Sequence, residues 1–499
     1  MPSNGLTFYD WAIIIGYAVA TIGLGYYYSR RQTSVREYFT GGGHMSPMLI
    51  GFSLFATLLS TISYLSIPGE AIGKGPVWML NYLTVPVVFI IVGYILIPVY
   101  MRTRVTSAYE LLEDRLGIGI RLFGGVMFIL LRLVWMALLV YLSAKAMTVM
   151  LGVDETWIPW ITLVTGLVAI TYTSLGGLRA VVITDTIQTL LMLGGALFVI
   201  GTVTYHFGGF GWAPSSWQPH WDEQPLFSLD PSVRLTVFGS MLASATWAVC
   251  TAGGDQTVVQ RFMATTDAQA ARRAYLTQQL VGIGIGGMLW VAGFALLSYF
   301  QAQPDILPEG IDIDANADKV FPHYIAYYLP PGVSGLVVAA MFAAAMSSLD
   351  SGVNSITAVV TTDFIDRFRT TTITENQHTR MAQILAFSIG AVVVISSSLM
   401  EHIPGNITAV TNKTSNLLTT PIFALFFFAL FVPFAKPWGV MAGALCGITT
   451  AALIAFSGPL FGMLPNGDDP ISFMWISPMA LAVNLSVGTA VSWILHRKQ

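Results

Sequence analysis

The chain has 499 residues, of which 55% are hydrophobic and only 10% are charged. Its mean hydropathy of +0.68 is far above that of a soluble protein. This composition indicates an all-α integral membrane protein, since an outer-membrane barrel would show short alternating segments in place of long apolar stretches. The formal charge of -3 identifies no partner, no nucleic-acid partner is expected, and the two cysteines imply neither a disulfide nor a metal site.

Hydropathy predicts thirteen transmembrane helices in one transmembrane domain covering residues 1–499. The predicted helices cover residues 7–28, 46–71, 76–101, 120–150, 156–175, 180–206, 233–253, 274–301, 333–362, 379–400, 405–432, 437–457 and 472–495. No basic region and no small-residue cleavage site precede the first apolar run, so we expect that run to be an uncleaved helix.

Basic residues gather in alternate connections between the predicted helices. The basic side holds Arg30, Arg31, Arg36, Arg102, Arg104, Arg115, Arg121, Arg179, Arg261, Arg272, Arg273, Arg367, Arg369, Arg380, Lys436, Arg497 and Lys498. The positive-inside rule therefore predicts an N-terminus outside and a C-terminus in the cytoplasm. We expect a multi-pass protein of the inner (plasma) membrane that functions as a monomer in the lipid bilayer.

Two connections on the opposite side are long. Residues 207–232 are rich in Trp, Pro and Gly, which is typical of an ordered loop and predicts one packed over the mouth of a pathway. Residues 302–332 turn amphipathic around residues 321–328, which predicts a short helix on the surface.

The segment from Gly51 to Ala71 carries polar side chains inside an apolar run and ends in Pro68, Gly69 and Glu70. Such a segment predicts a break in the helix. Backbone freed at a break is tolerated at membrane depth only where it lines a cavity or coordinates a ligand. The alternative is that each Ser or Thr bonds back to its own preceding turn.

A row of small oxygen-bearing side chains lies inside the segment from Ala339 to Ser355. At 100° per residue one face holds Ala344, Ser347, Ser348, Ser351 and Ser355, with Asp350 and Asn354 on its flank. Small residues also let membrane helices approach closely, which is the alternative. Asp350 favours an ion-binding face, because an acid at membrane depth costs roughly 3 kcal/mol or more.

A second acid, Asp185, lies in its helix about two turns beyond Arg179. It either pairs with Arg179 near the interface or holds a monovalent cation together with the serine face, since hard cations prefer oxygen ligands.

Two basic residues, Arg132 and Lys413, lie at membrane depth. Each either neutralises a buried acid or binds a substrate carboxylate. Trp78 and Tyr82 lie one turn apart and either form a stacking wall or pack ordinarily.

Five segments give the chain a family resemblance. They are FATLLSTISYLSIP at 55–68, TSAYELLEDR at 106–115, YTSLGGLRAVVITDTIQ at 172–188, VVQRF at 258–262 and FAAAMSSLDSGVNS at 342–355. In this order they resemble the solute:sodium symporter family, and within it the bacterial sialic-acid symporters. The resemblance implies a leucine-transporter-like core of ten helices over residues 46–432, built as a 5+5 inverted repeat with discontinuous first and sixth helices. Residues 7–28 would be an extra helix before this core and residues 437–495 two helices after it.

The resemblance also implies Na⁺ as the coupling ion and two sites for it. The first would use the backbone carbonyls of Ala56, Leu59 and Ala344 and the hydroxyls of Ser347 and Ser348. The second, present in some members, would use Asp185, Ser347, Asp350 and Ser351. At Asp350 the chain departs from sialic-acid symporters, which carry a hydroxyl there, so the carboxylate would either tighten the site or be protonated.

The substrate face implied by the resemblance consists of Thr57, Leu58, Ser60, Ser63, Trp78, Tyr82 and Trp135. Sialic-acid symporters hold the substrate carboxylate with an arginine where this chain has Trp135. Arg132 or Lys413 would have to supply the missing charge.

We therefore expect a sodium-coupled symporter, not an enzyme, that imports a small polar solute, either a sugar or a sugar acid, by alternating access. A sodium-coupled monocarboxylate or other small-anion symporter is the alternative. A membrane sensor without transport is more remote, because it would need an appended signalling domain. A membrane enzyme would need clustered chemical groups, and the seven histidines are scattered.

Overall fold

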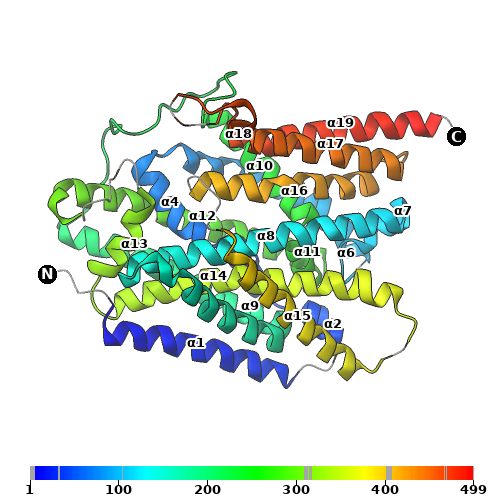
Figure 1. The fold of residues 1–499 in the computed structure, drawn as a ribbon, viewed down its shortest axis with the longest axis horizontal. Helices are drawn as coiled ribbons and strands as arrows, with labels where there is room; N and C mark the ends of the chain where they lie inside the picture. The colour runs from blue at the N-terminus through cyan, green and yellow to red at the C-terminus, as the bar shows by residue number, and fades with distance from the viewer. Residues whose placement is uncertain are drawn as a thin grey trace.

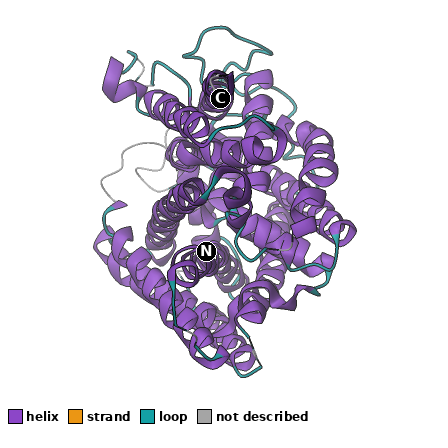
Figure 2. Ribbon diagram, turned by 90° about the vertical axis from the view of Figure 1, so that its right-hand side faces the viewer, coloured by secondary structure: helices purple, strands orange, loops and turns teal. Residues whose placement is uncertain are grey.

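The computed structural model describes residues 6–31, 34–103, 105–307, 313, 317–371, 373–400, 407–465, 467 and 469–497. All of its regular structure within these ranges is helical (Figure 2). The α-helices are α1 (Phe8–Ser29), α2 (Val35–Thr40), α3 (Pro47–Leu58), α4 (Thr61–Gly73), α5 (Val85–Ile90), α6 (Ile97–Thr103), α7 (Glu110–Leu116), α8 (Ile118–Leu151), α9 (Ile158–His206), α10 (Val237–Gly254), α11 (Gln256–Met263), α12 (Ala268–Ala302), α13 (Ala317–Tyr327), α14 (Val333–Val359), α15 (Glu375–Ser397), α16 (Ile407–Phe431), α17 (Pro437–Ala455), α18 (Ser457–Phe461) and α19 (Ile476–Arg497). The 3₁₀ and π segments are η1 (Gly41–Gly43), η2 (Val77–Thr84), η3 (Ile91–Leu96), η4 (Glu155–Trp157), η5 (Pro304–Ile306), η6 (Val360–Asp366) and η8 (Phe473–Trp475).

The long helices lie side by side as one bundle, with the two chain termini at opposite ends (Figure 1). By length and apolar composition, ten helical runs of the described residues could cross a membrane, or eleven if the bent pair α3 and α4 forms one span. This supports the prediction of an all-helical membrane protein.

The prediction of thirteen separate spans differs from this count at two further places. Residues 156–175 and 180–206 form the single run α9, interrupted at Gly177 (φ 57°, ψ -164°). Its 49 residues would extend over about 70 Å as one straight helix, more than twice the hydrocarbon core of a bilayer. The run is therefore long enough for two crossings. The other place is α10, where Ser, Thr and Gly dilute the apolar character.

Helix α14 lies at the centre of the bundle. In its span 83% of the most apolar 18-residue stretch is buried inside the protein. The same share is 22% for α1 and for the run that contains α19. It packs against α9, α8, α1 and α3. The predicted serine face is thus surrounded by protein and not by lipid.

The two long outer connections differ in how well they were predicted. The loop before α10 packs on the end of α4, where Trp221 Nε1 donates to the Ile72 carbonyl at 2.9 Å and Gln224 Nε2 donates to the Lys74 carbonyl at 2.6 Å. This agrees with an ordered loop. A short helix near Phe321 is confirmed by α13, but its predicted surface position is wrong, because residues 320–326 are buried against α4 and α8.

Helix α12 supports the broken segment through a glycine. A Cβ on Gly293 would lie 2.7 Å from the Pro68 carbonyl oxygen and 2.6 Å from the Ala71 Cβ, whereas a Cβ on Gly287 would meet nothing within 4 Å. We expect Gly293→Ala to push α4 outward and to lower stability by about 1–3 kcal/mol, as overpacking does. Thermal unfolding in detergent measures this. Gly287→Ala on the same helix is the control, and equal melting temperatures for the two variants would contradict the close contact.

Candidate functional site

The first part of the site is the break between α3 and α4. Leu59 (φ -86°, ψ 102°) and Ser60 (φ -90°, ψ 170°) are extended, and the two helix axes bend by 67°. The predicted break is therefore confirmed at Leu59 and Ser60. In an unbroken helix the Ala56 carbonyl would accept from the Ser60 N–H. The extended backbone ends this series of helical hydrogen bonds and leaves carbonyl oxygens free for another partner.

The serine face of α14 lies against this break. The Thr61 hydroxyl donates to the Met341 carbonyl at 2.9 Å, and the Thr57 and Ser351 hydroxyls lie 2.9 Å apart. These two contacts bracket the stretch of α14 that holds Ala344, Ser347 and Ser348. Small side chains on α14 let the two elements approach this closely.

Ser348 differs from its neighbours on α14. Its side chain is 4% exposed, and its hydroxyl has no hydrogen-bond partner among the described residues. Ser347, in contrast, donates to Asp185 Oδ1 at 2.6 Å. Since a buried hydroxyl without a partner is costly, the Ser348 oxygen is suited to a ligand that approaches from the break.

The second part of the site is a pair of fully buried carboxylates, Asp185 on α9 and Asp350 on α14. Asp185 accepts from Ser347 and from Ser53, whose hydroxyl lies 2.5 Å from Oδ2. Asp350 accepts from the Tyr172 hydroxyl and, at 3.2 Å, from Ser351. The structure thus brings together all four residues predicted for the second cation site.

An arginine that the sequence reasoning missed completes this cluster. Arg261 on α11 is fully buried, and its guanidinium lies 3.4 Å from Asp185 Oδ2. Its Nε donates to the Ser53 hydroxyl at 2.8 Å and its Nη2 donates to the Ser351 hydroxyl at 2.5 Å. The sequence places Arg261 in a connection between helices, whereas in the structure it lies on α11 inside the bundle.

The alternative that Asp185 pairs with Arg179 is wrong. Arg179 lies 2.9 Å from Glu37 and donates to the Gly41 carbonyl. Asp185 takes Arg261 instead, because α11 enters the bundle directly beside α3 and α14.

The two basic candidates at membrane depth both pair with acids. Arg132 contacts Asp255 and donates to the Thr257 hydroxyl at 2.9 Å, and Lys413 contacts Asp469. The prediction that each neutralises a buried acid agrees with the structure for Arg132, because Asp255 is buried, whereas Asp469, the partner of Lys413, is only half-buried. Their binding of a substrate carboxylate stays a prediction.

The remaining residues of the predicted substrate face differ in burial. Thr57 and Ser60 are buried, whereas Leu58, Ser63, Trp78, Tyr82 and Trp135 are half-buried. Trp78 packs against Phe473, with ring centroids 6.1 Å apart, and the Tyr82 hydroxyl lies close to Gly286 of α12. Each of these two aromatics thus contacts protein, as ordinary packing predicts, and their contact with a solute stays a prediction.

A separate charged cluster lies where α7, α8 and η6 meet. Arg121 Nε donates to Asp363 at 2.8 Å, and Arg121 also pairs with Glu113 at 2.6 Å. Hydrogen bonds from Arg367 and Arg121 lower the pKa of Glu113 to about 2. These contacts tie α7 to the end of the central helix run.

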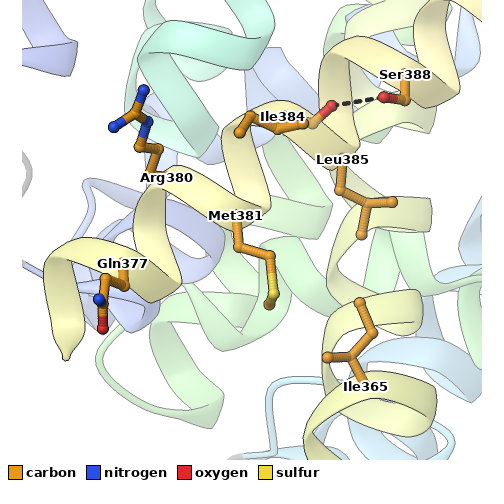
Figure 3. A pocket seen from close by; sticks show the side chains of 7 residues that line it. All are labelled: Ile365, Gln377, Arg380, Met381, Ile384, Leu385 and Ser388. Carbon is orange, nitrogen blue, oxygen red and sulfur yellow. Dashed lines mark hydrogen bonds between the residues drawn. The ribbon is translucent and has the colours of Figure 1, made fainter. Parts of the chain in front are cut away.

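A groove of about 400 Å³ lies between η6 and α15 (Figure 3). Its lining is mainly apolar, with Met381 and Leu385 of α15 pointing towards Ile365 of η6 and with Gln377 and Arg380 towards one end. None of the predicted site residues lines this groove, so it belongs to a different part of the molecule.

Comparisons with known proteins bear on this arrangement. The model of the sodium:solute symporter family matches residues 38–447. The sodium/sialic acid symporter SiaT of Proteus mirabilis is 28% identical over 92% of each chain, and the sodium/sialic acid symporter NanT of Aliivibrio fischeri is 29% identical over 88% of this chain and 86% of its own. The sodium-coupled monocarboxylate transporter 1 of Mus musculus is 27% identical over 93% of this chain and 76% of its own.

A solved structure has the same fold as this chain. It is described as the substrate-bound outward-open state of a Na⁺-coupled sialic acid symporter. It superposes with a TM-score of 0.79 at 25% identity, over 98% of both chains.

Proposed function

The chain belongs to the sodium:solute symporter family and is a sodium-coupled solute symporter of the membrane, not an enzyme, and from this premise we propose that it imports a sugar or sugar acid by alternating access. The solute would bind at the break between α3 and α4. The single observation that carries this assignment is the buried Ser348 hydroxyl, which has no partner among the described residues and lies on α14 between the two contacts with the broken segment.

We place the first Na⁺ at the carbonyls of Ala56, Leu59 and Ala344 and the hydroxyls of Ser347 and Ser348. All five oxygens are neutral, which suits a hard monovalent cation that must be released in every cycle. Each net charge moved inward gains about 2.3 kcal/mol per 100 mV of membrane potential.

A second Na⁺ would bind at Asp185, Ser347, Asp350 and Ser351. Ser347 would then serve both sites, since its hydroxyl already contacts Asp185. Shared use of Ser347 would couple the two ions.

The proposed core is a 5+5 inverted repeat running from α3 to α16, with α9 supplying two of its ten helices. The first core helix would be α3 with α4, and the sixth would be α10 with α11. Support for the sixth comes from Asp255, which has extended backbone (φ -91°, ψ 119°) and accepts a hydrogen bond from the Thr257 N–H as α11 begins. With α1 before the core and α17 and α19 after it, thirteen crossings result.

An odd number of crossings requires chain ends on opposite sides of the membrane. The positions of the two termini at opposite ends of the bundle support this (Figure 1). We propose an external N-terminus and a cytoplasmic C-terminus in the plasma membrane, with the monomer as the transporting unit.

The solute class follows from the lining of the proposed pocket. Hydroxyls at Thr57, Ser60 and Ser63 beside Trp78 and Tyr82 suit a polyhydroxylated solute. The relatives SiaT and NanT are named as sialic acid symporters. Trp135 argues against sialic acid itself, because Arg132 is already paired with Asp255. The monocarboxylate transporter among the relatives keeps a small anion as the second candidate.

A thermal-shift screen of the purified protein tests this proposal. Sugars, sugar acids including sialic acid, and monocarboxylates including lactate would each be added in NaCl and in KCl at equal ionic strength. The true solute is expected to raise the melting temperature more in NaCl, because a bound ligand at 100 times its Kd adds about 2.7 kcal/mol of stability. Equal shifts in NaCl and KCl for every solute would contradict coupled symport of these classes.

A further inference from the structure

Arg261 is a buried residue that has no role in the function proposed so far. It is a fully buried cation on α11 whose guanidinium contacts two of the four proposed ligands of the second Na⁺, Asp185 and Ser351. It also donates to Ser53, which in turn donates to Asp185. The guanidinium therefore occupies two of the four side chains that the ion would use.

Charge and geometry disfavour binding of Na⁺ at this site while the Arg261 guanidinium also contacts it. An arginine cannot lose its proton in a protein, so it always brings a positive charge to these oxygens. Two like charges within a few ångströms repel strongly inside a protein, where screening by water is weak. Na⁺ can use all of its ligands only when the guanidinium moves away from them.

We propose that the Arg261 guanidinium, a cation attached to the chain, occupies the second sodium site while Na⁺ is absent and is displaced when Na⁺ binds. This inference rests on the proposed second sodium site. Buried carboxylates without a counter-charge are costly, so a carrier that has released its ions needs a substitute for them. Arg261 supplies that substitute from within the chain and allows the empty site to reorient.

The mobile element in this exchange is α11. Its eight residues follow the extended Asp255, and Arg261 lies near its far end. It packs against α3, α10, α12 and α14. The Arg261 guanidinium contacts residues on α3, α9 and α14, so a small rotation of α11 at Asp255 would withdraw it from all three helices at once. Arg261 is thus a positioning residue for the ion and not a ligand of the solute.

The test is Na⁺ titration of the thermal stability of Arg261→Gln in the full-length protein, with choline replacing Na⁺ at constant ionic strength. We expect the half-saturating Na⁺ concentration to fall about tenfold, within the range typical of coupled sites. The Na⁺-induced rise in melting temperature should exceed that of the unaltered protein, because Asp185 and Asp350 then lack a counter-charge without the ion.

Two further variants complete the experiment. Arg121→Gln removes another buried arginine, which pairs with Asp363 away from the carboxylate pair, and should leave the half-saturating Na⁺ concentration unchanged. Arg261→Lys keeps a charge with fewer contacts and should give a smaller fall, and it carries the test if Arg261→Gln does not fold. An unchanged or raised half-saturating concentration in the Arg261 variants would overturn the proposal. If the unaltered protein itself shows no response to Na⁺, the proposed sodium sites fail instead.

Discussion

Replacing Ser348 with alanine is expected to shift the Na⁺ dependence of uptake to much higher Na⁺ concentrations. The variant loses one of five proposed neutral ligands, and the half-saturating Na⁺ concentration should rise on the order of tenfold or more, which corresponds to about 1.4 kcal/mol. Because the hydroxyl has no partner among the described residues, its removal strands no other polar group. The melting temperature without Na⁺ should therefore stay close to that of the unaltered protein.

Uptake into proteoliposomes under an imposed Na⁺ gradient measures this effect. Ser334→Ala is the matched control, since Ser334 lies at the start of α14 and donates to the Leu329 carbonyl at 3.2 Å, away from the break. It should keep Na⁺-driven uptake. A Ser348→Ala protein with unaltered Na⁺ dependence would remove Ser348 from the ion site and return the serine face to helix packing.

The break and the serine face could be predicted from the sequence because their signals are local. Polar side chains inside an apolar run predict a helix that does not continue, and the break lies among them at Leu59 and Ser60. Pro68 and Gly69, the other signal, lie inside α4 and do not end it. The face of α14 follows from helical periodicity alone. That the two lie against each other depends on long-range packing, and it was available only through the family resemblance.

Ion-pair partners could not be predicted in the same way. Arg132 and Asp255, or Asp185 and Arg261, are brought together by the packing of separate helices, and nothing in the local sequence selects one acid for one base. A signal for Arg261 did exist. Gly253, Gly254 and Asp255 end one helix and cap the next, so the following VVQRF segment could have been read as a new helix inside the bundle.

Asp350 is one of two positions, with Trp135, at which the family resemblance implies a departure from sialic-acid symporters. Asp350→Ala is expected to lower the Hill slope of Na⁺-dependent uptake from near 2 to near 1, the limits set by two coupled sites and one site. The carboxylate adds a charged ligand beside Asp185, so its removal should weaken the second site while Ser347 and Ser348 keep the first. Asp350→Ser, which restores a hydroxyl, should keep a slope above 1. The slope is measured as initial uptake against Na⁺ concentration at saturating solute.

A structural role for Asp350 would give a different pattern. Removing the carboxylate alone strands the buried Tyr172 hydroxyl, which costs about 1–3 kcal/mol. Adding Tyr172→Phe removes that hydroxyl as well, so the double variant should recover stability while its Hill slope stays near 1. If the slope of Asp350→Ala is unchanged and only its stability falls, Asp350 serves to hold α9 against α14. The second ion would then bind through Asp185 alone among the carboxylates.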